Sequence, residues 1–191
     1  MRVRKLLLVV VALVILATLS ACGGSEAPPD KAVAPKAPAT QQPQDDSNAP
    51  ADETLTVTVP KMQRVKDAAF PDTSGDDEDT LKNFAGIHLD GTGFPWQKEA
   101  NVYLAGHRLG YPGYPSFLAF YDLDNVQVGD QILVTDANGK EYNYEVFQTL
   151  EVDPTELFVT EPLQGKNILT LQSCTLPDYA RRLIVQAELK T

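Results

Sequence analysis

The stretch QILVTDANGKEYNYEVFQTLEV, residues 131–152, decides the fold class. Two strand candidates, Gln131–Thr135 and Tyr142–Val152, flank the tetrapeptide Asp136-Ala137-Asn138-Gly139. Asparagine and glycine tolerate positive φ, so the pair Asn138-Gly139 predicts a tight turn between antiparallel strands. The stretch is therefore interpreted as a β-hairpin.

The segments around this hairpin extend the β pattern. Leu55–Val59 alternates apolar and polar residues with period two, as a half-buried strand does, and Pro60 ends it. No long stretch with helical periodicity follows the first 22 residues. Four further strand candidates are Phe84–Leu89, Asn101–His107, Ile168–Cys174 and Leu183–Leu189. The chain from residue 54 to 191 is therefore predicted to be one all-β domain, a barrel.

Composition excludes several function classes. Sixteen basic and 26 acidic residues give a formal net charge of −10, which argues against a nucleic-acid partner because phosphate binding needs a concentrated basic face. Two cysteines among 191 residues are too few for a disulfide scaffold. With two histidines as well, thiol or imidazole chemistry has very few positions available.

The first 21 residues are predicted to be a signal peptide. Arg2, Arg4 and Lys5 precede an apolar run from Leu6 to Ala17, which is shorter than the roughly 20 residues a membrane span needs. The run closes with Leu19-Ser20-Ala21-Cys22, which resembles the bacterial lipobox. That resemblance implies a diacylglycerol on the Cys22 thiol and anchoring on the extracellular face of the cytoplasmic membrane. An ordinary secretory signal and an uncleaved signal anchor remain alternatives.

Residues 22–53 are expected to be the lipidated cysteine and a disordered tether. Residues 23–53 hold six of the 14 prolines, no aromatic residue and one large aliphatic residue, Val33. Such a segment cannot bury enough apolar surface to offset the entropy lost on ordering. Its predicted role is to hold the folded domain away from the membrane.

Cys174 is the main clue to function. If Cys22 is lipidated, Cys174 has no intramolecular partner in an exported protein, so it is either buried and inert or a reactive thiol. In its strand, Cys174 shares parity with Gln172 and lies opposite Leu171. Parity therefore places Cys174 on the polar outer face of the barrel.

The last strand is expected to present a cation on that same outer face. Its core face holds the aliphatic residues Leu183, Val185, Ala187 and Leu189. Arg182 then points outward and Arg181 has the parity of the core, with Ile184 as the one apolar residue on the wrong face. A loop of seven residues between Cys174 and Arg182 can bring the two strand ends side by side.

Four segments resemble the sortase family in order and spacing, and the similarity spans nearly all of residues 54–191. They are Leu104-Ala105-Gly106-His107-Arg108, Val128-Gly129-Asp130, Leu169-Thr170-Leu171-Gln172-Ser173-Cys174 and Arg182-Leu183-Ile184-Val185. The resemblance implies a closed barrel of about eight strands with short helical turns in its loops. It also implies a cysteine transpeptidase that cuts a C-terminal LPxTG-like sorting signal after threonine. Its partners would be proteins bearing that signal and an amine acceptor in a peptidoglycan precursor or a pilin.

The same resemblance implies roles for individual residues. Cys174 would be the nucleophile, His107 the general acid and base, and Arg182 the residue that positions substrate and stabilises the oxyanion. Ser173 stands where the family usually has threonine and keeps the hydroxyl. The loop from His107 to Tyr111 looks most like class E or related actinobacterial sortases, in which a tyrosine at this place reads the second position of the signal. Tyr111 and Ser173 are thus the candidate substrate-binding residues.

Two other features, the second histidine and an acidic run, are interpreted as structural or solvated and not as functional. His88 lies in a strand with no thiol or cationic motif nearby and is interpreted as structural. The run Asp76-Asp77-Glu78-Asp79 lacks the spacing of a calcium loop, and a charge run is usually a solvated face. No metal and no cofactor are therefore expected.

Two other functions stay open. A peptidoglycan cross-linking cysteine transpeptidase would carry a His-Gly-Cys signature, whereas Cys174 follows Gln172-Ser173. A non-catalytic surface lipoprotein that uses a sortase-like barrel for binding would tolerate the loss of Cys174, His107 or Arg182.

Overall fold

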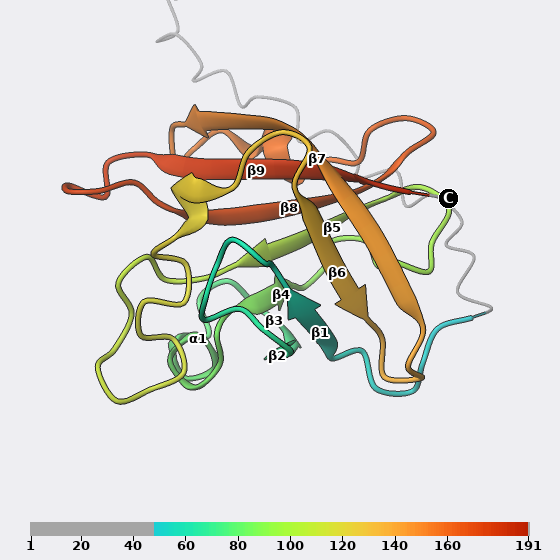
Figure 1. The fold of residues 1–191 in the computed structure, drawn as a ribbon, viewed down its shortest axis with the longest axis horizontal. Helices are drawn as coiled ribbons and strands as arrows, with labels where there is room; N and C mark the ends of the chain where they lie inside the picture. The colour runs from blue at the N-terminus through green and yellow to red at the C-terminus, as the bar shows by residue number, and fades with distance from the viewer. Residues whose placement is uncertain (1–47, 191) are drawn as a thin grey trace, which may run out of the picture. The chain divides into compact units, whose positions relative to one another are not determined.

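A computed structural model describes residues 48–190. One nine-stranded sheet dominates this part of the chain, in the strand order β2-β1-β6-β7-β9-β8-β5-β4-β3 (Figure 1). Its strands are β1 (Leu55–Thr58), β2 (Ala68–Phe70), β3 (Asp72–Thr73), β4 (Ile87–Leu89), β5 (Ala100–Ala105), β6 (Gln131–Thr135), β7 (Glu141–Val152), β8 (Asn167–Cys174) and β9 (Arg182–Leu189). Three short helical segments complete the described secondary structure: α1 (Glu78–Asn83), η1 (Leu123–Asn125) and η2 (Leu157–Thr160).

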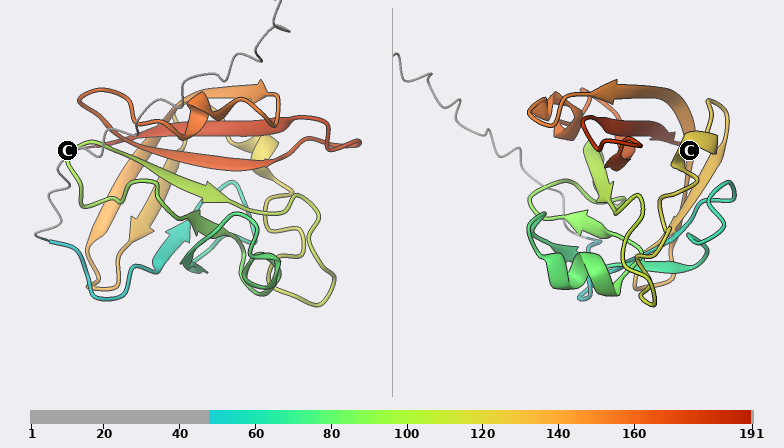
Figure 2. Two further views of the ribbon diagram at one scale, coloured as in Figure 1. Left: turned by 180° about the vertical axis from the view of Figure 1, so that it is seen from behind. Right: turned by 90° about the vertical axis from the view of Figure 1, so that its left-hand side faces the viewer.

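The sheet curls into a nearly closed barrel. Its two edge strands, β2 and β3, follow one another in the sequence with Pro71 alone between Phe70 and Asp72. A proline at this place suits an edge, because it has no N–H to offer a ladder. The view in the right panel of Figure 2 shows the sheet curving round on itself. The two edges therefore meet through the backbone at Pro71 rather than through a ladder of hydrogen bonds.

The barrel interior holds the main hydrophobic core. Every second residue of a strand points inward, so Val102 and Leu104 on β5, Leu171 on β8 and Val185 on β9 join one buried cluster. Phe120, in the long segment between β5 and β6, is also fully buried in that cluster. Burial of this interior makes the β5–β8–β9 part of the sheet a rigid support for whatever its strand ends carry.

A second apolar cluster covers the outer face of these strands. Tyr103, Val152, Val159 and Ile184 are all nearly or fully buried there, and Val159 comes from η2. Ile184 is therefore no misfit: the segment between β7 and β8 folds back over β9. The outward parity predicted for Ile184 is confirmed, but the outer face is covered there, and Thr170 and Gln186 on the same face are buried as well. At the strand end, Arg182 is only half-buried.

The predicted strands are confirmed with small shifts in their limits, except that the candidate Phe84–Leu89 shrinks to β4. Phe84 instead ends α1, whose C-cap it forms. The predicted turn forms between β6 and β7, with the Gly139 N–H donating to the Asp136 carbonyl at 2.9 Å. Only Gly139 has positive φ, at 81°, and Asn138 does not, so the predicted pair of positive φ angles is corrected to one. The Asp136 carboxylate also stabilises the turn, because it accepts hydrogen bonds from the backbone N–H groups of Asn138 and Lys140 at 2.9 and 3.0 Å.

The predictions for the amino-terminal segment fall mostly outside the described residues. The signal peptide (1–21), Cys22 and the tether up to residue 47 are not described, and residues 48–53 contain no helix or strand. Among residues 48–190, no helix is long and apolar enough to cross a membrane.

Candidate active site

Three neighbouring strands reach the same edge of the barrel, where β5 and β8 end and β9 begins. β5 runs parallel to β8, with Ala105 paired to Gln172, so two residues further on His107 comes beside Cys174. β9 runs antiparallel to β8, and Cys174 pairs directly with Arg182. The backbone pairing therefore places Cys174 opposite Arg182, and the β5–β8 register, extended two residues past the end of β5, brings His107 beside Cys174.

Parity assigns the three side chains to one face, since His107 has the parity of Tyr103 and Ala105, which pack in the outer cluster. Cys174 is two residues from Gln172, and Leu171 on the opposite parity lies in the interior core. Arg182 faces the same way as Cys174 because directly paired residues share a face. Cys174 is a free, half-buried thiol. The outer-face prediction for Cys174 is thus confirmed, and its thiol is not part of either hydrophobic cluster.

Ser173 fixes the end of β8 to the end of β5. Its side chain is 1% exposed, and its Oγ donates to the Gly106 carbonyl at 2.8 Å. The Gly106 N–H in turn donates to the Gln172 carbonyl at 3.1 Å, so the parallel pairing continues past the end of β5. A Cβ at position 106 would overlap the ring of Phe120, which explains why glycine stands there. Ser173 therefore supports the site from the barrel interior and does not line the outer face.

Tyr103 and Gln172 are hydrogen-bonded to each other on the outer face that carries Cys174. The Tyr103 hydroxyl donates to Gln172 Oε1 at 2.5 Å. Burial raises the pKa of the Tyr103 hydroxyl, and the nearby positive charge of Arg182 opposes that rise. Tyr103 therefore stays neutral at physiological pH and presents a polar edge next to the Arg182 guanidinium.

The loop between β8 and β9 closes tightly and holds Arg182. Thr175 N–H donates to the Arg181 carbonyl at 3.0 Å, and the Arg181 N–H donates back to Thr175 Oγ1 at 3.1 Å. The Arg182 Nη1 group donates to the carbonyls of Tyr179 and Arg181, each at 3.3 Å. The loop backbone thus binds one side of the guanidinium, and the other N–H groups of Arg182 form no hydrogen bond or ion pair within residues 48–190.

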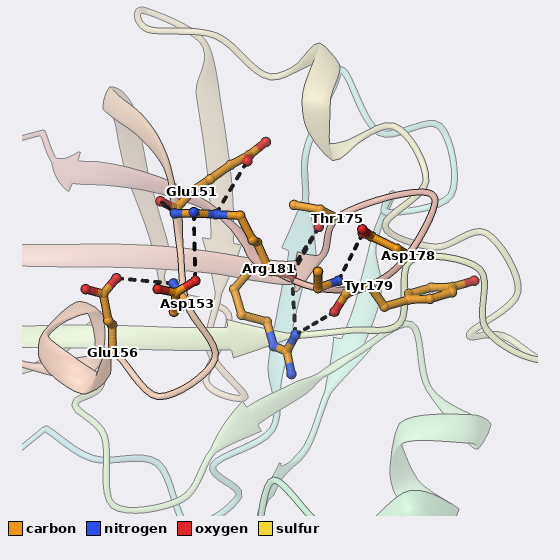
Figure 3. Close-up of polar contacts among 9 residues, drawn as sticks. Glu151, Asp153, Glu156, Thr175, Asp178, Tyr179 and Arg181 are labelled. Atoms are coloured by element: carbon orange, nitrogen blue, oxygen red, sulfur yellow. Dashed lines mark hydrogen bonds and ion pairs between the residues drawn. The ribbon is translucent and has the colours of Figure 1, made fainter. Parts of the chain in front are cut away.

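Arg181 has a different environment (Figure 3). Its Nη2 donates to the Glu151 carbonyl at 2.8 Å, and its guanidinium lies 3.8 Å from the carboxylates of both Glu151 and Asp153. Arg181 is therefore tied to the end of β7. The register assigns Arg182, and not Arg181, to the position opposite Cys174.

His107 is bound by a residue that the sequence analysis did not single out as functional. Its Nε2 lies 3.0 Å from Glu78 Oε1, and the same oxygen accepts from the Tyr111 hydroxyl at 2.5 Å. The Tyr111 ring packs edge-on against the imidazole, with 5.6 Å between centroids. The hydrogen bond from Tyr111 lowers the pKa of the Glu78 carboxyl, as does the neighbouring His107, so this group is an anion at neutral pH.

Glu78 reaches the site because the acidic run is the start of a helix. Asp77 is the N-cap of α1, and its side chain accepts from the Thr80 N–H at 3.0 Å. The acidic run is largely exposed, as expected of a solvated face, but Asp77 and Glu78 also have specific partners. An aspartate followed by acidic residues and then by Leu81 is a signal for a helix start, and it was available in the sequence. Among residues 48–190 no group of three or more potential ligands is arranged to hold a metal ion.

His88, the second histidine, has separate partners. It is fully buried, its Nδ1 lies 2.6 Å from Asp72 Oδ1, and its Nε2 lies 2.9 Å from the Gly93 carbonyl. Its ring also stacks on Phe94 at 4.3 Å between centroids. Since both ring nitrogens are bound within the β3–β4 region, His88 is a structural residue, as the sequence indicated.

A thiol, an imidazole and a guanidinium on one face of three joined strands define a candidate thiol-nucleophile site on a β-barrel. The family comparison agrees with that class, because the sortase-domain model matches residues 57–190, more than half of the chain. The chain belongs to the sortase family.

Individual relatives support the same assignment. Sortase A of Streptococcus agalactiae serotype III (strain NEM316) is 35% identical over 91 residues, which are 47% of this chain and 36% of that protein. The crystal structure of sortase C1 from Streptococcus agalactiae is similar with a TM-score of 0.61 and 28% identity over 71% of this chain and 66% of that one. A lid mutant of sortase A from Corynebacterium diphtheriae gives a TM-score of 0.60 and 26% identity over 76% of this chain and 74% of that one. The chain thus spans little more than a third of the length of the first relative.

Proposed function

We propose that this protein is a cysteine transpeptidase that cleaves an LPxTG- or LAxTG-like sorting signal after threonine and passes the acyl group to an amine. The observation that carries the proposal is the pairing of Cys174 with Arg182, together with the parity that assigns His107, two residues past the end of β5, to the same outer face. Membership of the sortase family supports it. The acceptor is an amine of a peptidoglycan precursor or of a pilin, and no cofactor takes part.

In the first half-reaction the Cys174 thiolate attacks the threonine carbonyl carbon. The carbonyl oxygen then carries a negative charge that the Arg182 guanidinium stabilises, because Arg182 is paired opposite Cys174 and the loop carbonyls hold one side of its guanidinium. When the C–N bond breaks, imidazolium His107 gives its proton to the leaving amine. The products are a thioester on Cys174, a neutral imidazole and a free amine.

The second half-reaction reverses these proton transfers. The acceptor amine attacks the thioester carbonyl, neutral His107 takes the proton from that amine, and the thiolate of Cys174 leaves. The net reaction exchanges one amide for another and needs no external oxidant or reductant. A positive charge on the imidazole also favours the thiolate over the thiol, so the same residue prepares the nucleophile for the next cycle.

Tyr111 supports the narrower proposal of an LAxTG signal, as in class E sortases. Its hydroxyl donates to Glu78, so the oxygen lone pairs remain to accept a hydrogen bond from a substrate N–H. Alanine at the second position of the signal has that N–H and proline has none. A site built around a substrate donor penalises an analogue that lacks it.

A hollow of about 400 Å³ beside the strand ends supports an amine as the second substrate. Its charged lining comprises Asp122, Asp124, Glu151 and Arg108. Asp124 pairs with Arg108 at 2.7 Å and Glu151 lies 3.8 Å from Arg181, so Asp122 is the lining carboxylate without an ion pair among the described residues. Thr175, the residue after Cys174, also lines this hollow. The surplus of carboxylates favours an amine over an anionic acceptor.

We also propose that the amino terminus places this reaction outside the cell. A lipid on Cys22 and a tether up to residue 53 would hold the domain on the extracellular face of the cytoplasmic membrane, where proteins with a C-terminal sorting signal emerge. Labelling intact cells with radioactive palmitate, for the wild type and for Cys22→Ser, tests the anchor. Equal labelling of the two would overturn it.

The proposed reaction is tested by mixing the protein with a sorting-signal peptide and either triglycine or a lysine-like amine, followed by mass analysis of the products. The wild type is expected to yield the transpeptidation product and Cys174→Ala none, while both give the same circular dichroism spectrum. A thiol reagent should label Cys174 in the native wild type, because that residue is half-buried. No product with any peptide, together with labelling only in denaturant, would favour a non-catalytic binding protein.

A further inference from the structure

Glu78 connects two residues of the proposed site through one oxygen. Its Oε1 lies 3.0 Å from His107 Nε2 and accepts the Tyr111 hydroxyl at 2.5 Å. The three residues come from α1 and from the segment after β5, so tertiary folding, and not sequence proximity, brings Glu78 to the imidazole. This contact is absent from the motifs that carry the sortase resemblance.

The carboxylate is held in place from two directions. The cap at Asp77 fixes the first turn of α1, since Asp77 also accepts from the hydroxyls of Thr73 and Thr80 at 2.9 and 2.7 Å. Tyr111 fixes the other side of Glu78 and lowers the pKa of its carboxyl. Glu78 therefore presents a fixed negative charge to His107 near neutral pH.

A carboxylate bound to Nε2 determines which nitrogen of the neutral imidazole carries the proton. An ionised carboxylate is only an acceptor, so Nε2 must carry the proton in the neutral ring as well as in the imidazolium. The Nδ1 atom of His107 has no hydrogen-bond partner among the described residues. Nδ1 is therefore the nitrogen that remains to exchange a proton with the thiol and with the amines.

We propose that Glu78 is a positioning residue of this transpeptidase, which fixes the tautomer and orientation of His107. The inference rests on the proposed function for its catalytic consequence, whereas the tautomer follows from the contact alone. A nucleophile, a base and a third group that orients the base form a general pattern in enzymes with activated nucleophiles. Here the third group comes from α1, outside the barrel.

Other charged and titratable groups surround His107. On the sheet, Cys174 and Arg182 share its face. From α1, the Lys82 ammonium lies 5.6 Å from the centre of the Tyr111 ring and 4.2 Å from that of Tyr114. Glu78 is the carboxylate in direct contact with the imidazole within the described part of the chain, so its removal changes the charge next to the ring.

The test compares Glu78→Gln with Asp79→Asn in the full chain. Both substitutions remove one negative charge from the first turn of α1, and Asp79 makes no side-chain contact with His107 among the described residues. We expect Glu78→Gln to lower kcat for transpeptidation about tenfold with little change in KM, since general acid–base catalysis contributes about 10²–10⁴-fold and the imidazole is retained. Asp79→Asn should behave as the wild type.

A spectroscopic arm separates this inference from the proposed function. The chain has two histidines, so nitrogen NMR can be assigned with His88→Gln as reference and reports the tautomer of His107 without any substrate. We expect neutral His107 to be the Nε2–H form in the wild type and a mixture of tautomers in Glu78→Gln. A wild type that is mainly Nδ1–H, or a Glu78→Gln variant with the wild-type tautomer and kcat, would overturn the inference. If no peptide is processed but the tautomer differs as expected, the positioning of His107 stands and the proposed function fails.

Discussion

Ser173→Ala tests whether one buried hydroxyl holds the nucleophile strand in place. The Ser173 side chain is 1% exposed, and its hydroxyl donates a hydrogen bond to the Gly106 carbonyl at 2.8 Å. A typical hydrogen bond contributes about 0.5–1.5 kcal/mol net, and a buried acceptor left without its partner costs about 1–3 kcal/mol. Because alanine leaves the carbonyl in place and removes only the donor, we expect a loss of about 1–2 kcal/mol in the free energy of unfolding. That loss raises the unfolded fraction about 5- to 30-fold.

Urea denaturation followed by circular dichroism measures this loss. The midpoint should fall while the m-value stays that of the wild type, since the surface exposed on unfolding hardly changes. Transpeptidation by the folded variant should also be slower, because the bond joins β8 to β5 one residue before both Cys174 and His107. Ser173→Thr keeps the hydroxyl and should retain most of the activity. An unchanged midpoint in Ser173→Ala would refute the energetic reasoning, and lower stability with wild-type kcat would confine the bond to a structural role.

Two further substitutions test the proposed roles of single side chains. Arg182→Lys should lower kcat by about 10²–10³, the usual loss for one oxyanion donor, because an ammonium cannot both bind the loop carbonyls and present a planar fork to the substrate. Arg181→Lys is the matched control, since Arg181 is bound to the end of β7. A larger loss of kcat in Arg181→Lys would reverse the assignment. In a competition between paired LAxTG and LPxTG peptides, the wild type should favour alanine and Tyr111→Phe should lose that preference, measured as the ratio of the two products. Equal use of both peptides by the wild type refutes the preference, and an unchanged preference in Tyr111→Phe refutes the hydroxyl as its cause.

The long strands could be predicted from the sequence because their physics is local. Alternation with period two and a glycine that tolerates positive φ identify the β6–β7 hairpin without any knowledge of its neighbours. Parity within β8 and β9 also placed Cys174 and Arg182 on one face, and the observed pairing of the two residues confirms that placement. Two short strands, β2 and β3, were missed because three and two residues carry no periodic signal.

The surroundings of the site depend on contacts between distant segments. Ile184 was judged a misfit because nothing in β9 tells that Val159 will fold over it. Glu78 was assigned to a solvated acidic run for the same reason, since its contact with His107 joins residues 29 positions apart. Sequence patterns predict which face of a strand a side chain occupies. The residues that it contacts on that face can be identified only from the folded structure.

The most direct test of the central claim is the intact mass of the protein quenched in acid during reaction with a sorting-signal peptide. The proposed mechanism predicts a species heavier by the peptide fragment that ends at threonine, attached to Cys174 and released by hydroxylamine as a thioester is. Cys174→Ala should show no such species. An adduct that persists in Cys174→Ala, or a wild type that turns over peptide with the adduct mapped to another residue, would contradict the assignment of Cys174 as the nucleophile.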